Sequence, residues 1–109
     1  MGGIEADSLY GTLNLLVLRA LEAGPLHGLG VIRRIVDEAG GALKIEEGAL
    51  YPALHRLERD GWIEGEWGRT PENRRAKFYR LTRTGRRHLE RETERWVRHT
   101  EVVARLLGA

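Results

Sequence analysis

Apolar residues recur at helical spacing in three successive segments of the chain. The pattern predicts helices over residues 9–21, 29–39 and 47–59, because apolar positions return every three or four residues in each of them. The turns that follow these segments contain the residues that end helices: Gly24-Pro25, Gly40-Gly41 and Asp60-Gly61. The second and third segments are joined by a short connection, which predicts a helix-turn-helix.

The pattern then changes to that of strands. Residues 62–67 and 76–81 are rich in strand-forming types, and the segment 68–73 between them is dense in turn residues. A hairpin directly after a helix-turn-helix is the wing of a winged helix. We expect Trp62 and Trp67 to pack at the root of this wing.

A single long helix is predicted from Thr82, its N-cap, to the end of the chain. About 25 residues would span roughly 37 Å. Six positions follow the alternating spacing of a coiled-coil seam: Leu89, Thr93, Trp96, Thr100, Val103 and Leu107. The predicted fold is therefore mainly α with a small β-hairpin, a winged helix-turn-helix over residues 1–82 followed by a C-terminal dimerisation helix over residues 83–109.

The predicted dimer contacts lie on the first and last helices. The first helix is apolar on more than one side, so we expect Leu9 and Leu13 to meet a partner as well as their own domain. On the last helix the predicted contacts are Leu89, Trp96, Val103 and Leu107. The indole of Trp96 also offers a flat surface on which an aromatic effector could stack, with packing across the dimer as the alternative.

Composition narrows the classes of function. The 109 residues suffice for one domain, and the absence of cysteine excludes disulfides and thiolate metal sites. The four histidines show no metal-ligand spacing, there is one serine, and no phosphate-binding loop or nucleophile motif occurs. We expect no metal, no cofactor and no enzymatic activity. With no signal peptide or membrane span in the pattern, the expected location is the cytoplasm.

The positive charge is concentrated in one segment. The net charge is only +2, yet residues 69–87 hold eight Lys or Arg and a single acid, Glu72. Such a patch fits a phosphate backbone, although a solvated charged surface is the alternative. Within the predicted wing, Arg74, Arg75 and Lys77 are the candidate phosphate or minor-groove contacts.

The third helix has the features of a recognition helix. Its stripe of leucines would face the core, which places the polar side chains on the outside, where a major groove about 12 Å wide could receive them. Pro52 must lie near the helix start, which puts that start near Glu47. An ordinary solvated face is the alternative. The candidate DNA contacts are Tyr51, His55, Arg56 and Arg59.

Four motifs of the chain together resemble the PadR family of bacterial transcriptional regulators. They are GPLHG at 24–28, GALYPALHRLE at 48–58, GWI at 61–63 and RRAKFYRLT at 74–82, followed by Gly85. The short chain with one C-terminal helix resembles the compact subgroup. The glutamates Glu46 and Glu47 depart from the family pattern, in which Ser, Thr or Gln with Pro is common, and they would repel nearby phosphates.

The resemblance implies a homodimeric repressor that binds double-stranded DNA at a palindromic operator. It implies that Tyr51 and the basic wing touch DNA, and that the last helix contacts the first helix of the partner. It further implies tuning by a hydrophobic or aromatic small molecule near the dimer interface and, for compact members, an association with transporter genes. A winged-helix protein-interaction module without DNA binding and a small enzyme are the competing functions, but the basic wing argues against the first and the lack of a catalytic constellation against the second.

Overall fold

The computed structural model describes residues 4–5 and 12–109 of the chain. Its elements follow one another as β1 (Ile4–Glu5), α1 (Thr12–Ala20), β2 (Leu26–His27), α2 (Gly28–Glu38), β3 (Leu43–Lys44), α3 (Glu47–Arg59), β4 (Ile63–Arg69), β5 (Arg75–Leu81) and α4 (Arg83–Leu107). All four predicted helices and the predicted hairpin are confirmed. The predicted start of the first helix at Leu9 lies outside the described residues.

The three short helices pack around one apolar core. Val17 and Leu18 of α1, Val31 of α2, and Leu50 and Leu54 of α3 are at most 1% exposed. In α1 and α3 these are positions that the helical periodicity assigns to the inner faces. In α2 the periodicity of Leu29, Ile32, Val36 and Ala39 is misleading, because Val31 and Ile35 are the buried apolar residues and Leu29 is 40% exposed. Fully burying such a side chain contributes about 1.5–3 kcal/mol, so this cluster fixes the orientation of the helix-turn-helix.

Helix α3 begins and ends where the sequence predicts. Glu46 is its N-cap, and Pro52 lies only six positions into the helix, so a single backbone hydrogen bond, to the carbonyl of Gly48, is lost. At the other end, Gly61 adopts a left-handed φ of 80° and the amide of Trp62 donates to the carbonyl of Leu57. The result is a helix of 13 residues with defined ends.

The wing belongs to a three-stranded antiparallel sheet with the order β2-β5-β4. In the hairpin, Ile63 pairs with Leu81 at the root and Arg69 pairs with Arg75 at the tip. The third strand, β2, was not predicted, nor was the parallel pair of β1 with β3. Strands of two residues are too short to show an alternating pattern, so periodicity cannot reveal them.

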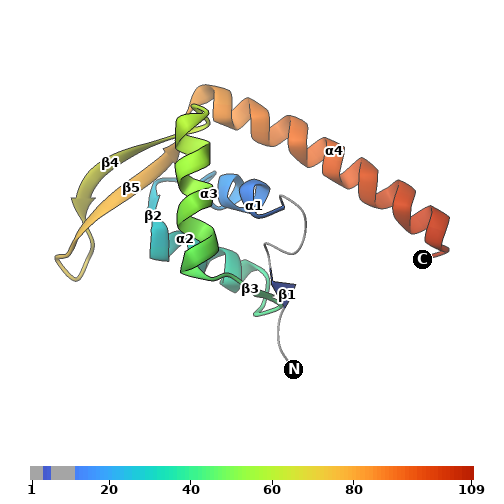
Figure 1. Cartoon of the computed structure of the whole chain (residues 1–109), viewed down its shortest axis with the longest axis horizontal. Helices are drawn as coiled ribbons and strands as arrows, with labels where there is room; N and C mark the ends of the chain where they lie inside the picture. The colour runs from blue at the N-terminus through green and yellow to red at the C-terminus, as the bar shows by residue number, and fades with distance from the viewer. Residues whose placement is uncertain (1–3, 6–11) are drawn as a thin grey trace.

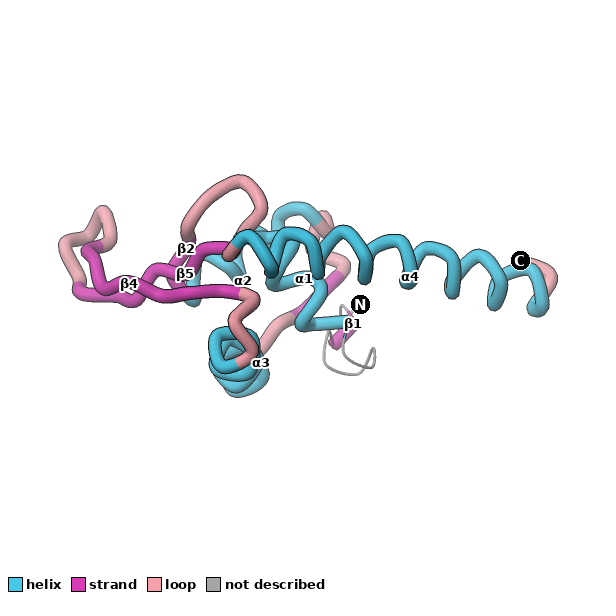
Figure 2. The backbone as a smooth tube through the Cα atoms, turned by 90° about the horizontal axis from the view of Figure 1, so that it is seen from above, coloured by secondary structure: helices cyan, strands magenta, loops and turns pink. Residues whose placement is uncertain are grey.

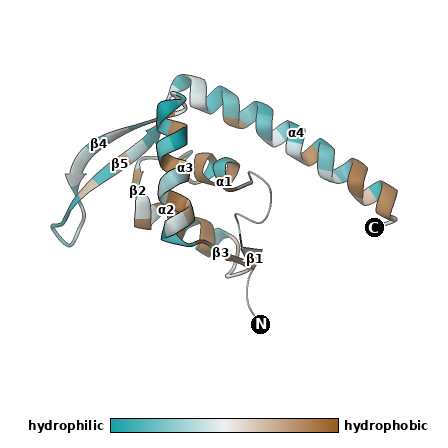
Figure 3. Cartoon of the chain, viewed as in Figure 1, coloured by the Kyte–Doolittle hydropathy of each residue, from teal (hydrophilic) through white to brown (hydrophobic). Residues whose placement is uncertain are grey.

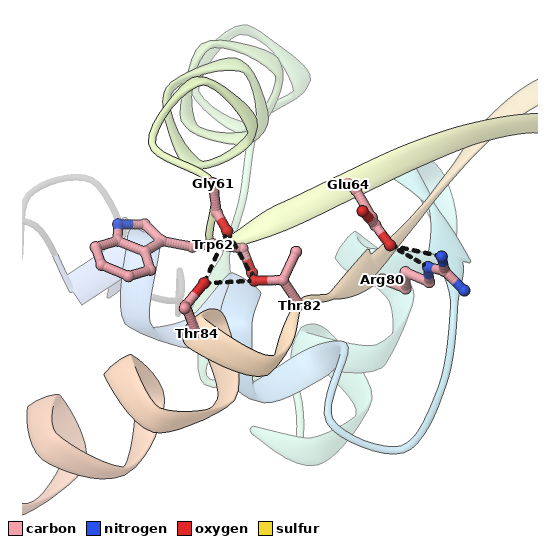
Figure 4. Close-up of polar contacts among 6 residues, drawn as sticks. All are labelled: Gly61, Trp62, Glu64, Arg80, Thr82 and Thr84. Carbon is pink, nitrogen blue, oxygen red and sulfur yellow. Dashed lines mark hydrogen bonds and ion pairs between the residues drawn. The ribbon is translucent and has the colours of Figure 1, made fainter.

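Thr82 joins the wing root to α4. Its hydroxyl oxygen accepts a hydrogen bond from the Gly85 amide at 2.9 Å, which confirms the predicted N-cap. The same hydroxyl lies 2.7 Å from the carbonyl oxygen of Gly61, to which Thr84 also donates (Figure 4). The start of α4 is therefore tied to the turn that ends α3.

The remainder of α4 extends away from the other elements (Figure 1). Leu89, in its second turn, is 3% exposed and part of the core, whereas Leu106 and Leu107 are 82% and 76% exposed. Figure 2 shows α3 nearly end-on, on one side of the layer that contains the hairpin and α4. One face of the molecule thus presents α3 beside the wing.

Candidate DNA interface

The outer face of α3 presents three of the predicted contact residues to solvent. Tyr51, His55 and Arg59 are exposed, while the leucines behind them are almost fully buried. The spacing of four residues places these three side chains along one side of the helix. The side of the helix that the sequence analysis assigns to DNA is therefore free to meet a ligand.

Tyr51 lies across the first residue of α2. A Cβ atom built on Gly28 would approach the Tyr51 hydroxyl to 2.6 Å and its ring carbons to 2.8 Å. No side chain larger than hydrogen fits at residue 28 unless Tyr51 swings away. The last glycine of the GPLHG motif, Gly28, therefore leaves room for the phenol against the N-terminus of α2, where backbone amides favour anions.

The two arginines of α3 have weak, exposed partners. Arg56 donates to the side-chain oxygen of Asn14 on α1, and Arg59 lies beside Asp60, each at 3.4 Å. Arg56 therefore turns toward α1, and Arg59 stays at the exposed end of the helix. Long, exposed pairs of this kind contribute little to stability, so a phosphate or a base edge can replace the partner at low cost.

The acidic start of α3 is partly compensated. Glu46 lies 3.6 Å from the ammonium group of Lys44 on β3, and both side chains are exposed. Glu47 occupies the first turn of α3, where a carboxylate stabilises the helix dipole. Both glutamates thus have favourable local electrostatic surroundings at this helix end.

The tip of the wing is tied by its own hydrogen bonds. Thr70 accepts from the amide of Asn73 and its hydroxyl accepts from the amide of Arg74, while the Arg69 side chain donates to the carbonyl of Asn73. Asn73 adopts a left-handed φ of 62° to close the turn. The guanidinium of Arg74 makes no ion pair with any residue that the structure describes, so it is available to a phosphate.

Lys77 differs from the other cations of the wing. Its ammonium group is 3.0 Å from the carboxylate of Glu58 on α3, and both side chains are about 30% exposed. The hydrogen bond to Glu58 raises the pKa of Lys77. Burial raises the pKa of neighbouring Tyr79. The wing is thus attached to α3 by a charged pair that the sequence analysis did not foresee.

Both wing tryptophans were predicted to pack at the wing root, and the structure confirms this for one of them. Trp62 packs at the wing root as expected, with its ring stacked on His88 at 4.1 Å. For Trp67 the expectation is wrong, because it lies opposite Lys77 in the outer part of the hairpin and is 59% exposed. The guanidinium of Arg75 lies 4.5 Å from the centre of the Trp67 ring.

The predicted dimer contacts fall into two groups. Leu13 and Leu89 are 5% and 3% exposed and pack in the core of their own chain. Leu89, which the coiled-coil spacing places on the seam toward a partner, is therefore part of the core of its own chain. Trp96, Val103 and Leu107 are exposed, and Figure 3 shows apolar residues in the part of α4 that extends away from the domain. Leu9 lies outside the described residues.

A groove of about 670 Å³ lies between α1 and α4. Trp96 lines it together with Leu15 and Leu18 of α1, and the two histidines His88 and His99 add polar groups. The groove thus combines an exposed indole with apolar and hydrogen-bonding side chains. Among the described residues there is no cluster of three or more His, Cys, Asp or Glu that could hold a metal ion.

Within the described part of the chain, no helix has both the length and the apolar character needed to cross a membrane.

Comparison with known proteins identifies the family. Residues 17–91 match the family model described as the transcriptional regulator PadR-like family. A transcriptional regulator from Clostridium thermocellum, Cth-833, is 26% identical with a TM-score of 0.81 and covers 94% of this chain and 96% of its own. A PadR family transcriptional regulator from Eggerthella lenta is 32% identical with a TM-score of 0.78. The match covers 93% of this chain and 86% of that regulator.

A curated protein of undescribed function is similar over almost the whole chain. It is an uncharacterized protein, X, from Lysinibacillus sphaericus, 25% identical over 92% of both chains. The family model covers well over half of the chain, including the whole helix-turn-helix, the hairpin and the first turns of α4. The chain therefore belongs to the PadR-like family of transcriptional regulators.

Proposed function

We propose that the chain is a cytoplasmic, homodimeric repressor that binds a palindromic operator in double-stranded DNA. The observation that carries this proposal is the outer face of α3, where Tyr51, His55 and Arg59 are exposed above a buried row of leucines. The basic wing lies beside this face. A helix so presented, next to a cationic hairpin, fits a major groove and its flanking phosphates.

The contacts divide by what each can recognise. Arg59 and His55 are the candidates for base edges, because their side chains reach outward from the middle and the end of α3. Tyr51, Arg56, Arg74 and Arg75 are the candidates for phosphates, which position the helix without reading sequence. Lys77 also adds positive charge to this face, although Glu58 already compensates its ammonium group.

Dimerisation is assigned to the region 83–109, with Trp96, Val103 and Leu107 as its exposed apolar contacts. The first helix of a partner, with Leu9 as its predicted contact, is the expected opposite surface, whereas Leu13 is buried in the core of its own chain. In a two-fold dimer the two recognition helices would enter successive major grooves about 34 Å apart. The operator should accordingly be a palindrome with half-sites one helical turn apart.

The experiment that tests this function is selection of bound sequences from a random pool of DNA duplexes. It should yield a palindrome. Titration of variants against this duplex and its single-base substitutions should then separate the roles of two residues. Arg59→Ala should cost about 1–3 kcal/mol at one base pair and relax its identity, whereas Tyr51→Phe should weaken all duplexes by a similar factor. If wild-type protein enriches no sequence and shifts no duplex, the protein-interaction module becomes the better assignment.

A second proposed function is regulation by a hydrophobic or aromatic small molecule. The groove between α1 and α4 favours this idea, because the Trp96 ring is 43% exposed and lines a space of about 670 Å³. A ligand held there would contact the helix assigned to the dimer. Quenching of Trp96 fluorescence by such a compound, lost in Trp96→Leu, is the expected result.

A further inference from the structure

A second concave surface lies on the face that carries α3 and the wing. A space of about 560 Å³ separates the hairpin from the N-terminal parts of α2 and α3. Three exposed apolar side chains, Leu29, Tyr51 and Trp67, line it, with exposed fractions of 40%, 45% and 59%. Large apolar groups gathered on one exposed surface mark a binding site more often than single ones do.

Cations surround these apolar groups. The lining includes Arg33 of α2, Arg74 at the hairpin tip and Arg75 of β5, with Glu72 as its one acid. The structure gives neither Arg33 nor Arg74 an ion-pair partner among the residues that it describes. The surface is therefore both apolar and positively charged, and it is continuous with the outer face of α3 through Tyr51.

Trp67 and Arg75 form a preformed pair within this surface. The guanidinium carbon of Arg75 lies 4.5 Å from the centre of the indole ring, which is a cation–π distance. The pair lies where the two strands approach the wing tip, since Arg75 is opposite Arg69 and Trp67 is opposite Lys77. Stacking on the ring limits the rotation of Arg75 and so reduces the entropy that a phosphate contact would cost.

We propose that Trp67 and Arg75 together bind one sugar–phosphate strand of the DNA duplex, with the indole against a deoxyribose and the guanidinium on a phosphate. This inference rests on the proposed DNA binding. It adds Trp67, an uncharged residue, to the arginines of the wing as a DNA contact. A sugar–phosphate strand alternates apolar sugar faces with anions, and the surface offers an apolar ring beside cations. A small aromatic anion is the competing occupant, and the experiment below separates the two.

The test compares wild-type protein with Trp67→Phe and Trp67→Ala on the duplex selected for the wild type. Acrylamide quenching reports how accessible the tryptophans are, independently of affinity. DNA should reduce quenching of the wild type, and this reduction should be much smaller in Trp67→Phe, which lacks the indole proposed to contact DNA and keeps the exposed Trp96 on α4. Trp67→Ala should weaken binding by about fivefold to tenfold, as expected when roughly 50 Å² of apolar contact is lost.

Arg75→Gln is the matched variant for the charged half of the pair. It should lower the slope of log K against log salt concentration by about 1, the value for one phosphate contact. It should leave the contact of the indole with the sugar, and therefore most of the protection from quenching, in place. Circular dichroism of each variant confirms that it is folded.

Four outcomes decide the inference. Loss of protection in Trp67→Phe together with weaker binding by Trp67→Ala supports it. Unchanged quenching and affinity in a protein that still binds its selected duplex overturns it while leaving the proposed function intact. Protection of Trp67 by benzoate, with none by DNA, also overturns it and assigns the surface to a small aromatic anion. If the wild type binds no duplex, the proposed function fails as well.

Discussion

The ammonium nitrogen of Lys77 lies 3.0 Å from both carboxylate oxygens of Glu58. The two residues are 19 positions apart in sequence, and their pairing joins β5 of the wing to the last turns of α3. Less than a third of each side chain is exposed, so the pair is less screened by solvent than an ion pair between fully exposed side chains. The pair therefore joins the wing directly to α3.

The first prediction concerns this pair. Lys77→Met and Glu58→Gln should each lower the free energy of unfolding by about 0.5–1 kcal/mol, and the double variant should lose less than the sum, because either change alone already breaks the pair. Urea unfolding of the four proteins measures the coupling. Strictly additive losses would show that the two charges do not interact in solution.

Comparing Lys77→Met with Arg74→Ala shows whether Lys77 contacts a phosphate of DNA or only pairs with Glu58. Arg74→Ala, which removes an unpaired cation, should lower the salt slope of DNA binding by about 1. Lys77→Met should lower it by less, since Glu58 already neutralises the ammonium group. A full unit of change in Lys77→Met would mean that DNA displaces Glu58 and that Lys77 contacts a phosphate directly.

The second prediction follows from the raised pKa values of Lys77 and Tyr79 on β5. The hydrogen bond to Glu58 raises the pKa of Lys77 above 10.5, and burial raises the pKa of Tyr79 above 10.0. A group with a raised pKa in the folded state binds its proton more tightly there, so its stabilising effect is complete at lower pH and is lost as the pH rises past these values. Unfolding free energy should therefore fall above pH 10.

Tyr79→Phe and Lys77→Met should each make this alkaline decline shallower, because each removes one group whose proton is lost. Urea unfolding at several pH values between 8 and 12 provides the comparison, with pH 8 as the reference for each protein. A decline of equal steepness in all three proteins would exclude both groups as its source.

The third prediction concerns Gly85 in the first turn of α4. A Cβ atom built there would overlap the backbone carbonyl oxygen of Trp62. Since the Trp62 carbonyl also accepts a hydrogen bond from the Thr82 amide, it cannot move without cost. Gly85→Ala should lower the free energy of unfolding by about 3 kcal/mol or more.

Gly48→Ala is the control for this substitution. Gly48 lies in the first turn of α3 with no atom within 4 Å of a built Cβ. Alanine has a higher helix propensity than glycine, so this variant should be as stable as the wild type or more stable. Thermal unfolding of both variants checks the contrast, and a Gly85→Ala protein of unchanged stability would contradict the close packing of α4 on the turn.

The helices and the hairpin could be predicted because their signals are local. Apolar periodicity, the Gly61 turn and the Thr82 cap all lie within the segments that they organise. The exposed side of α3 followed from the same periodicity. The buried position of Leu89 did not, because its spacing is compatible both with a seam toward a partner and with the core of its own chain.

The contacts that sequence reasoning missed join segments far apart in the chain. Glu58 and Lys77, and Tyr51 and Gly28, meet only after the helices and the hairpin have packed. The exposure of Trp67 depends on how far the hairpin extends beyond the helices, which the strand pattern alone does not specify. The one local sign that Trp67 is exposed was its position beside arginines in a basic hairpin.

The last prediction concerns the exposed apolar seam of α4. Val103 and Leu107 are 39% and 76% exposed in the part of the chain that the structure describes. If two copies associate through this seam, Val103→Glu combined with Leu107→Glu places charges in an apolar interface and repeats them across the two-fold axis, where like charges repel. Analytical ultracentrifugation should then find monomers where the wild type is a dimer. Arg91→Glu, on the opposite side of the helix, introduces a similar charge and should remain dimeric. A double variant that keeps the dimer mass and a helical circular dichroism spectrum would exclude this seam, and the two-fold arrangement of recognition helices would then require another interface.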